Sequence, residues 1–245
     1  MKLQNFLILA VALAILGNGC INYSSKTTEV NDPGFDTAAM ETENDRDPYG
    51  KAEKAFNDLD VEPSEKLDPN QSEYSMADRL SWYEKLPWSK ECEADYRLSS
   101  DKEAGGLAFY KISDQNYIMR ADCYLAAYQK GMVFMLVSVD GQNISGGQFE
   151  EQIYDPQTKT VKINTENDGQ FLGSDSFDTK NKTLTIYTKG RGIGDCGSRS
   201  TYRLKNTDLE LVKEVAMSCE DADAFHLKNP DADTMPPWPV IYEKK

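Results

Sequence analysis

Residues 132–139 read MVFMLVSV and residues 183–188 read TLTIYT, and runs of this kind decide the fold class. Each run is short, rich in β-branched, aromatic or other apolar residues, and bounded by turn-forming residues, which is the pattern of a β-strand. Further runs of the same character cover residues 107–112, 117–121, 161–163, 200–204, 209–215 and 240–242. Strands at intervals of about 10 residues predict an all-β protein: an antiparallel meander, a sandwich or a barrel.

Turn chemistry between these runs supports the same prediction. Four short segments favour tight reversals of the chain, through a positive φ or through Asx side-chain hydrogen bonds: Asp140-Gly141, Asp155-Pro156, Asp168-Gly169 and Asn206-Thr207-Asp208. No amphipathic helix of 10 or more residues stands out among the strands. We therefore expect a β-rich domain over residues 79–245.

The N-terminus has the pattern of a secretory signal peptide over residues 1–19. Lys2 precedes the run FLILAVALAIL at residues 6–16, which ends at the small and polar Gly17-Asn18-Gly19. A membrane-spanning helix needs about 20 apolar residues, so this run is too short to span a bilayer. The pattern predicts export into a compartment where disulfides form.

Cys20 follows directly after Gly19, and this junction resembles the lipobox of bacterial lipoproteins. Gly17 stands where that pattern usually has Leu, and cleavage by an ordinary signal peptidase, giving a soluble secreted protein, is the alternative. We expect Cys20 to be lipidated, because two acyl chains give stable anchoring. The predicted location is therefore the outer membrane or periplasm, with the protein anchored by lipid.

The segment from Cys20 to Asp78 predicts a disordered acidic linker, which a short helix around Ala52 to Leu59 could interrupt. It is rich in Asn, Asp, Glu and Thr and has few apolar residues. Residues 21–78 hold 15 acids and 5 bases, a net charge of −10, whereas residues 79–245 hold 26 acids and 21 bases, or −5. The whole chain has a formal charge of −14, so phosphate backbones and anionic membranes should repel it. We expect no nucleic-acid partner, and contact with a membrane through the lipid anchor only.

Four cysteines remain if Cys20 is lipidated: Cys92, Cys123, Cys196 and Cys219. An even number in an exported domain predicts two disulfides, for which three pairings are arithmetically open. We expect Cys92 to pair with Cys123 and Cys196 with Cys219, because each pair brackets a local strand unit. A zinc or redox site is the alternative, but the sequence has no Cys-x-x-Cys spacing and one His, so we expect no metal and no cofactor.

Several blocks together resemble the domain-of-unknown-function 1176 family of proteobacterial envelope proteins. They are Trp82-Tyr83, Leu86-Pro87-Trp88 and Cys92, then CYLAAYQ at residues 123–129, KGRGIGDCG at residues 189–197 and a closing Cys219. The resemblance covers residues 79–245. It implies an exported β-rich domain with paired cysteines and no established activity, and it supplies no catalytic residues.

The most distinctive candidate site is the glycine-rich segment around Gly190, Arg191, Gly192, Gly194 and Asp195. Phosphate-binding glycines lead from a strand into a helix, but here a strand precedes the segment and another strand is expected after it. We interpret the segment as a wide hairpin loop locked by Cys196. Arg191 and Asp195 are then either paired with each other or displayed to a partner, and the loop is the candidate recognition site.

Other candidate sites are weaker. Asn164, Glu166, Asp168, Gly169 and Asp175 loosely follow a calcium loop, but flanking helices are not expected, and a solvated acidic turn is the simpler interpretation. His226 lies in the acidic stretch 220–233, which we expect to be irregular. Asp221 or Asp223 could orient it near Ser218 or Ser198, yet no nucleophile motif supports a triad. Trp82, Trp88 and Trp238 are expected to pack in the core, with an aromatic binding platform as the alternative.

We therefore expect an exported, non-enzymatic binding module that recognises an envelope protein or a cell-wall component. Its most concrete version inhibits or controls a peptidoglycan-directed enzyme, because an acidic domain complements the basic surface of a lysozyme-like partner. A carboxylate-based envelope hydrolase and a purely structural envelope lipoprotein are the alternatives. The sequence assigns no catalytic residue to either.

Overall fold

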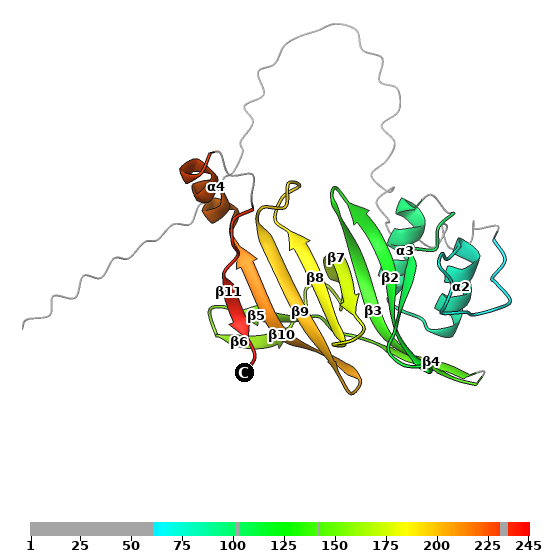
Figure 1. The fold of residues 1–245 in the computed structure, drawn as a ribbon. Helices are drawn as coiled ribbons and strands as arrows, with labels where there is room; N and C mark the ends of the chain where they lie inside the picture. Colours follow the sequence, from blue (N-terminus) through cyan, green and yellow to red (C-terminus); the bar gives the residue numbers. More distant parts are fainter. Residues whose placement is uncertain (1–60, 101–102, 142, 231–234) are drawn as a thin grey trace, which may run out of the picture. The chain divides into compact units, whose positions relative to one another are not determined.

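The computed structural model describes residues 61–100, 103–141, 143–230 and 235–245 (Figure 1). Its helices are α2 (Met76–Lys85), α3 (Lys90–Ser99) and α4 (Cys219–Lys228). The strands are β1 (Leu107–Lys111), β2 (Asn116–Ala126), β3 (Gln129–Asp140), β4 (Asn143–Gln148), β5 (Gln152–Asp155), β6 (Thr160–Ile163), β7 (Phe171–Asp178), β8 (Thr183–Lys189), β9 (Gly197–Lys205), β10 (Asp208–Met217) and β11 (Val240–Glu243). Each strand run predicted from the sequence coincides with one of these strands.

One antiparallel sheet of nine strands organises the fold. Its order is β1-β2-β3-β7-β8-β9-β10-β11, and β4 pairs with β3 outside this path, while β5 and β6 form a separate hairpin. Strand β3 changes its neighbour along its length: residues 130–132 pair with β7, and residues 135–140 pair with β4. The prediction of an antiparallel β fold is confirmed.

Strand β3 is buried on both faces, which is why residues 132–137 are apolar without interruption. Val133, Met135 and Val137 point into a first core, and Met132 and Phe134 point into a second core on the opposite face. The molecule therefore has three layers at this strand, with β3 in the middle layer.

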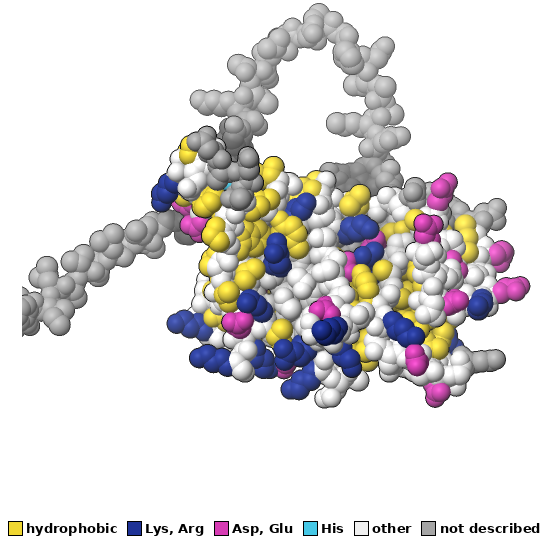
Figure 2. All heavy atoms as spheres, in the orientation of Figure 1, with side chains coloured by type: hydrophobic (Ala, Val, Ile, Leu, Met, Phe, Trp, Pro, Cys, Tyr) yellow, Lys and Arg dark blue, Asp and Glu magenta, His cyan; other side chains and the backbone are white. Residues whose placement is uncertain are grey.

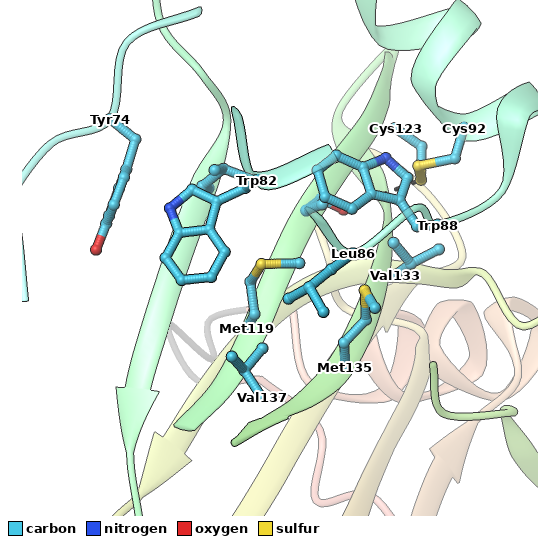
Figure 3. Packing of buried hydrophobic residues seen from close by; sticks show 12 residues of the cluster. Tyr74, Trp82, Leu86, Trp88, Cys92, Met119, Cys123, Val133, Met135 and Val137 are labelled. Carbon is cyan, nitrogen blue, oxygen red and sulfur yellow. Dashed lines mark hydrogen bonds between the residues drawn. A yellow bond between two sulfur atoms is a disulfide. The ribbon is translucent and has the colours of Figure 1, made fainter. Parts of the chain in front are cut away.

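The first core lies between β1 to β3 and the helices α2 and α3 (Figure 3). Trp82 of α2 is fully buried there, and Trp88 enters from the segment between the helices. The disulfide between Cys92 and Cys123 fixes α3 to β2 inside this core. The expectation of core packing is thus correct for two of the three tryptophans.

The second core lies between the other face of β1 to β3 and strands β7 to β10. Phe171 stands edge-on to both Phe134 and Tyr202, with ring centroids 5.2 and 5.6 Å apart. The β5–β6 hairpin covers part of this core, and Tyr154 of β5 stacks on Tyr242 of β11 at 5.0 Å.

The expectation that no helix of 10 residues would occur is wrong, because α2, α3 and α4 each have 10 residues. Ser75, Ser89 and Ser218 cap their first turns by accepting backbone N–H bonds. Helix α4 occupies most of the stretch that we expected to be irregular. Each of α2 and α3 buries charged side chains on its inner face, so an apolar period does not mark that face.

The buried charges on α2 and α3 form one cluster around Glu93, which is fully buried. Arg79 Nε donates to Glu93 Oε2 at 2.8 Å, and Arg97 Nε donates to Glu93 Oε1 at 2.7 Å. Trp88 Nε1 also donates to Glu93 Oε2, at 3.1 Å. The Arg79 guanidinium lies 3.8 Å from the centre of the Tyr96 ring, which adds a cation–π contact. This cluster joins the two helices.

The predicted boundary at residues 78 and 79 is also wrong, because the folded part begins earlier. Tyr74 and Met76 are buried, and Ser64 N–H donates to the Ala77 carbonyl at 3.2 Å. Residues 61–78 therefore belong with the folded domain. The predicted signal peptide, Cys20, the linker up to residue 60 and the short helix around Ala52 lie outside the described residues. Within the described residues, no helix combines the length and the apolar character that crossing a bilayer requires.

Candidate functional site

The glycine-rich loop, residues 190–197, connects β8 to β9, so two antiparallel strands flank it. Gly190 N–H donates to the Cys196 carbonyl at 2.9 Å, and Gly194 N–H donates to the Arg191 carbonyl at 2.9 Å. The Tyr187 hydroxyl donates to the Gly194 carbonyl. The loop is a hairpin connection with its own internal hydrogen bonds, as the sequence predicts, and it does not lead into a helix.

Two glycines in this loop are required by close packing. A Cβ atom on Gly190 would lie 2.9 Å from Cys196 Sγ and 3.0 Å from Cys219 Sγ. Gly197 has φ of +134°, and a Cβ atom there would lie 2.1 Å from the Thr188 carbonyl oxygen. These glycines make room for the disulfide and the neighbouring strand, which explains them without a phosphate ligand.

Both predicted disulfides are present. Cys196 pairs with Cys219 across 23 residues, and Cys92 pairs with Cys123 across 31 residues. The Cys196–Cys219 bond joins the last turn of the loop to the first residue of α4. The loop and the helix are therefore held together covalently.

Asp195 is buried and lies at the centre of a polar network at the same place. Arg191 Nε donates to Asp195 Oδ1 at 2.7 Å, and Arg191 Nη2 lies 2.7 Å from Asp223 Oδ1 on α4. His226 Nε2 lies 3.3 Å from Asp195 Oδ2, and Trp238 Nε1 donates to the Asp195 carbonyl at 3.2 Å. The hydrogen bonds from Arg191 hold the pKa of Asp195 below its usual value.

Arg191 is consequently paired, and the first of the two alternatives for it is the correct one. Its side chain remains 34% exposed, so one edge of the guanidinium reaches solvent. Asp195 holds the shape of the loop through its hydrogen bonds with Arg191. Neither residue is a free charge displayed to a partner.

Large apolar side chains surround this fixed loop. Ile193 at the loop tip is 70% exposed, and Leu125, next to the β2–β3 turn, is 69% exposed. Tyr128, in that same turn, lies with its hydroxyl 3.5 Å from the Gly190 carbonyl oxygen. We call this surface the loop end: residues 190–197 together with Leu125, Tyr128 and α4. Figure 1 shows the β2–β3 turn, the β8–β9 loop and α4 at one end of the sheet.

A family model described as "Protein of unknown function (DUF1176)" matches residues 43–226. The chain belongs to this family. The match includes all four disulfide cysteines, the glycine-rich loop and His226, and it begins before residue 79, as the folded part of the described residues does. No curated protein and no solved structure matches the chain.

The remaining candidates in this DUF1176 domain have structural partners. Asp221 accepts from the Ser218 hydroxyl at 2.7 Å as part of the α4 cap, and Asp223 pairs with Arg191. Neither carboxylate orients His226, which faces Asp195 instead. A serine triad at this histidine is therefore not assembled.

The proposed acidic turn of the DUF1176 domain is confirmed as a turn at Asp168 and Gly169, which have φ of +44° and +74°. Asn164 donates to Glu151 Oε2 at 2.6 Å, and Asp175 accepts from Arg120 Nη1 at 2.7 Å. These side chains are thus directed to separate partners. Among the described residues, no group of three or more His, Cys, Asp or Glu side chains is arranged to hold a metal ion.

The sequence analysis missed a pair of acidic residues, Glu151 and Glu214. Burial raises the pKa of Glu151 and of Glu214, and repulsion from Glu214 raises the pKa of Glu151 further. Glu214 Oε2 is buried without a hydrogen-bond partner in the described part of the chain. Nothing in the sequence marks this pair, because residues 63 positions apart meet only when β5 lies over β10.

The DUF1176 domain also has a groove of about 570 Å³. Gly146 and Gly147 of β4 line one side, and Phe149, Ile163 and Leu209 contribute apolar surface. Its lining includes no residue of the loop end and neither Glu151 nor Glu214. The candidate functional surfaces are therefore separate.

Proposed function

We propose that this DUF1176 domain is a non-enzymatic binding module of the cell envelope that holds a protein partner at the loop end. The observation that carries the proposal is the exposure of Ile193 and Leu125 around a loop whose shape is fixed. Large apolar side chains at the surface contribute to affinity when a partner covers them.

The loop end is pre-organised for binding. The Cys196–Cys219 disulfide and the two carboxylates on Arg191 hold the loop against α4. A rigid loop loses little conformational entropy when a partner binds, so more of the contact energy contributes to affinity. This rigidity supports a recognition role for the loop over a flexible linker role.

A peptidoglycan-directed enzyme with a basic surface is the partner class that we propose. Glu220, Asp221 and Asp223 lie in the first half of α4 at the loop end, and Glu220 and Asp221 are exposed. Residues 79–245 as a whole carry a net charge of −5. Charge complementarity of this kind raises association rates and selects against acidic partners.

Export and lipidation complete the proposal. The apolar run at residues 6–16 and the Gly19-Cys20 junction support a signal peptide and a lipid anchor, and two disulfides fit an oxidising compartment. Mass spectrometry of the mature N-terminus tests this directly. A diacylated Cys20 supports the anchor, and an unmodified Cys20 or a start elsewhere contradicts it.

The binding role is tested with a chain that begins at position 20 and carries Cys20→Ser. A basic lysozyme is titrated with this protein while its activity on peptidoglycan is followed. Ile193→Ser should weaken inhibition at least tenfold, whereas Ile163→Ser, a matched change on β6, should leave it unchanged.

Arg191 is a less suitable position for testing this surface, because its guanidinium is paired with Asp195. Arg191→Ala removes the main partner of the buried Asp195 carboxylate, so it should lower the melting temperature as well as weaken binding. Ile193→Ser therefore tests the surface with less disturbance of the fold. If neither lysozyme nor another envelope enzyme is bound, the proposed partner class is wrong.

A carboxylate-based hydrolase is the second candidate, and the Glu151 and Glu214 pair favours it. Glycosidases use two carboxyl groups, one of which has a raised pKa and acts as an acid. If the protein cleaves peptidoglycan or a model glycan, and Glu151→Gln or Glu214→Gln abolishes the cleavage, the hydrolase replaces the binding module.

A further inference from the structure

The outer face of β8 to β11, which points away from the second core, carries a mixed apolar and basic surface. Residues that face each other across the strands form rows on this face. One row consists of Tyr187, Arg199, Val215 and Val240. A second row consists of Leu184, Tyr202 and Leu211, and its side chains point into the second core. Because successive side chains of a strand point to opposite faces of the sheet, the first row faces outward.

The upper part of this outer face is apolar. It includes the uncharged segment 235–241, MPPWPVI, in which Met235 is 57% exposed and Val240 is 51% exposed. The Trp238 ring centre lies 5.6 Å from that of Tyr187, and the Arg199 guanidinium lies 5.6 Å from the centre of the Trp238 ring. Figure 2 shows hydrophobic side chains gathered here, beside α4.

The lower part of the same face is basic, as the dark blue side chains in Figure 2 show. The cations of the outer face are Arg199, beside Trp238 in the upper part, and Arg203, Lys205, Lys213 and Lys244 below it; all but the partly exposed Lys213 are exposed. Glu210 pairs with Lys205 and Lys244, and Glu243 pairs with Lys213. Among the described residues, Arg199 and Arg203 form no ion pair, so their charges are available to an anionic ligand.

We propose that the outer face of β8 to β11 docks on the surface of an anionic phospholipid bilayer. The exposed aliphatic side chains enter the boundary between headgroups and acyl chains, while Arg199, Arg203 and the lysines meet the phosphate groups. Tyr187 and Trp238 have the amphipathic rings that suit this boundary. The proposal concerns a different surface from the loop end, so either can fail without the other.

The net charge of −14 does not prevent this contact. Charges more than about 8 Å apart are largely screened at physiological ionic strength, so a bilayer senses mainly the charges on the face that meets it. A soluble polyanion would account for the arginines but not for the exposed Met235 and Val240. The apolar segment beside the cations is the reason to favour a bilayer.

The test uses residues Arg46–Lys245, which contain both cores and both disulfides and exclude the apolar run at residues 6–16. Thermal melting verifies that each protein is folded. Co-sedimentation is then measured with phosphatidylglycerol vesicles and with phosphatidylcholine vesicles. We expect binding to phosphatidylglycerol only, and weakening of that binding as salt is raised.

Two pairs of matched variants locate the contact. Arg203→Gln with Lys205→Gln should weaken vesicle binding by about tenfold or more, whereas Lys85→Gln with Lys90→Gln, on α2 and α3, should not. Val240→Ser should weaken it as well, whereas Ile163→Ser should not. The proposal is overturned if phosphatidylglycerol vesicles are not bound, or if the control variants lose as much binding. Equal affinity for a soluble polyanion, with no effect of Val240→Ser, also overturns it.

Discussion

Glu93→Gln is the change that most directly tests how α2 and α3 are held on the sheet. Glu93 is fully buried and accepts from Arg79, Arg97 and Trp88. The substitution keeps the size of the side chain and removes its negative charge. Two guanidinium groups, fully or almost fully buried, then share the site with no anion between them.

The expected loss of stability is large because the uncompensated charges cannot reach water. Removing one partner from a buried ion pair costs about 3–5 kcal/mol, and here one anion serves two cations. Domains unfold with a free energy of roughly 5–15 kcal/mol, so this is a sizeable fraction of the total. For a domain of this size the melting temperature should fall by about 10 °C.

Urea unfolding followed by tryptophan fluorescence measures this loss, because Trp82 and Trp88 lie beside the cluster. Glu84→Gln, an exposed change on α2, is the matched control and should cost under about 0.5 kcal/mol. Arg97→Met should cost less than Glu93→Gln, since Arg79 still neutralises Glu93. If Glu93→Gln and Glu84→Gln unfold at the same urea concentration, the account of the cluster is refuted.

Three further changes test the loop and the acidic pair. Replacing Cys196 and Cys219 with Ala should lower the free energy of unfolding by about 3 kcal/mol, from the 23-residue separation, as chemical denaturation will show. Gly190→Ala should lower the melting temperature because its Cβ would meet both sulfurs, whereas Gly147→Ala, which faces open space, should have a smaller effect. Burial raises the pKa of Glu214 in the folded state above its value in the unfolded state. The ionised Glu214 side chain therefore destabilises the fold: this loss of stability is absent below the unfolded pKa and grows as pH rises through the folded pKa. Glu214→Gln should therefore raise the melting temperature at pH 7 but not near pH 4, and a fall at pH 7 would contradict the assignment.

The strands were predictable because their evidence is local. In TLTIYT, Leu184 and Ile186 alternate with polar residues, and both are buried in the second core. The disulfides were predictable for a similar reason, since each pair brackets a short unit. The turns at Asp140-Gly141 and Asn206 also hold, with positive φ at Gly141 and Asn206.

The helices were not predictable from apolar spacing, because charged residues occupy core positions. Arg79, Glu93 and Arg97 are buried only because they neutralise one another across two helices, which no local pattern reveals. Strand β7 was missed for a related reason. Its Asp175 points inward to Arg120, a residue 55 positions away.

Only part of the candidate site could be derived from the sequence. The residues 190–197 were found from their glycines, and the pairing of Arg191 with Asp195 was one of two stated alternatives. Leu125 and Tyr128 were not assigned to the site, because the β2–β3 turn meets the loop only through the sheet order. Asp223 of α4 pairs with Arg191, and Trp238, before β11, donates to the Asp195 carbonyl. These contacts join separate elements, so only the structure reveals them.

The two proposed surfaces meet at Trp238. Its indole N–H donates to the Asp195 carbonyl at the loop end, and its ring packs beside Tyr187 and Arg199 on the outer face. Tyr187 connects the same surfaces, since its hydroxyl donates to the Gly194 carbonyl. A domain docked on a bilayer through the outer face would therefore hold the loop end in a defined orientation to that bilayer. Because both surfaces are built on β8 and β9, docking and partner binding need no conformational change to occur together.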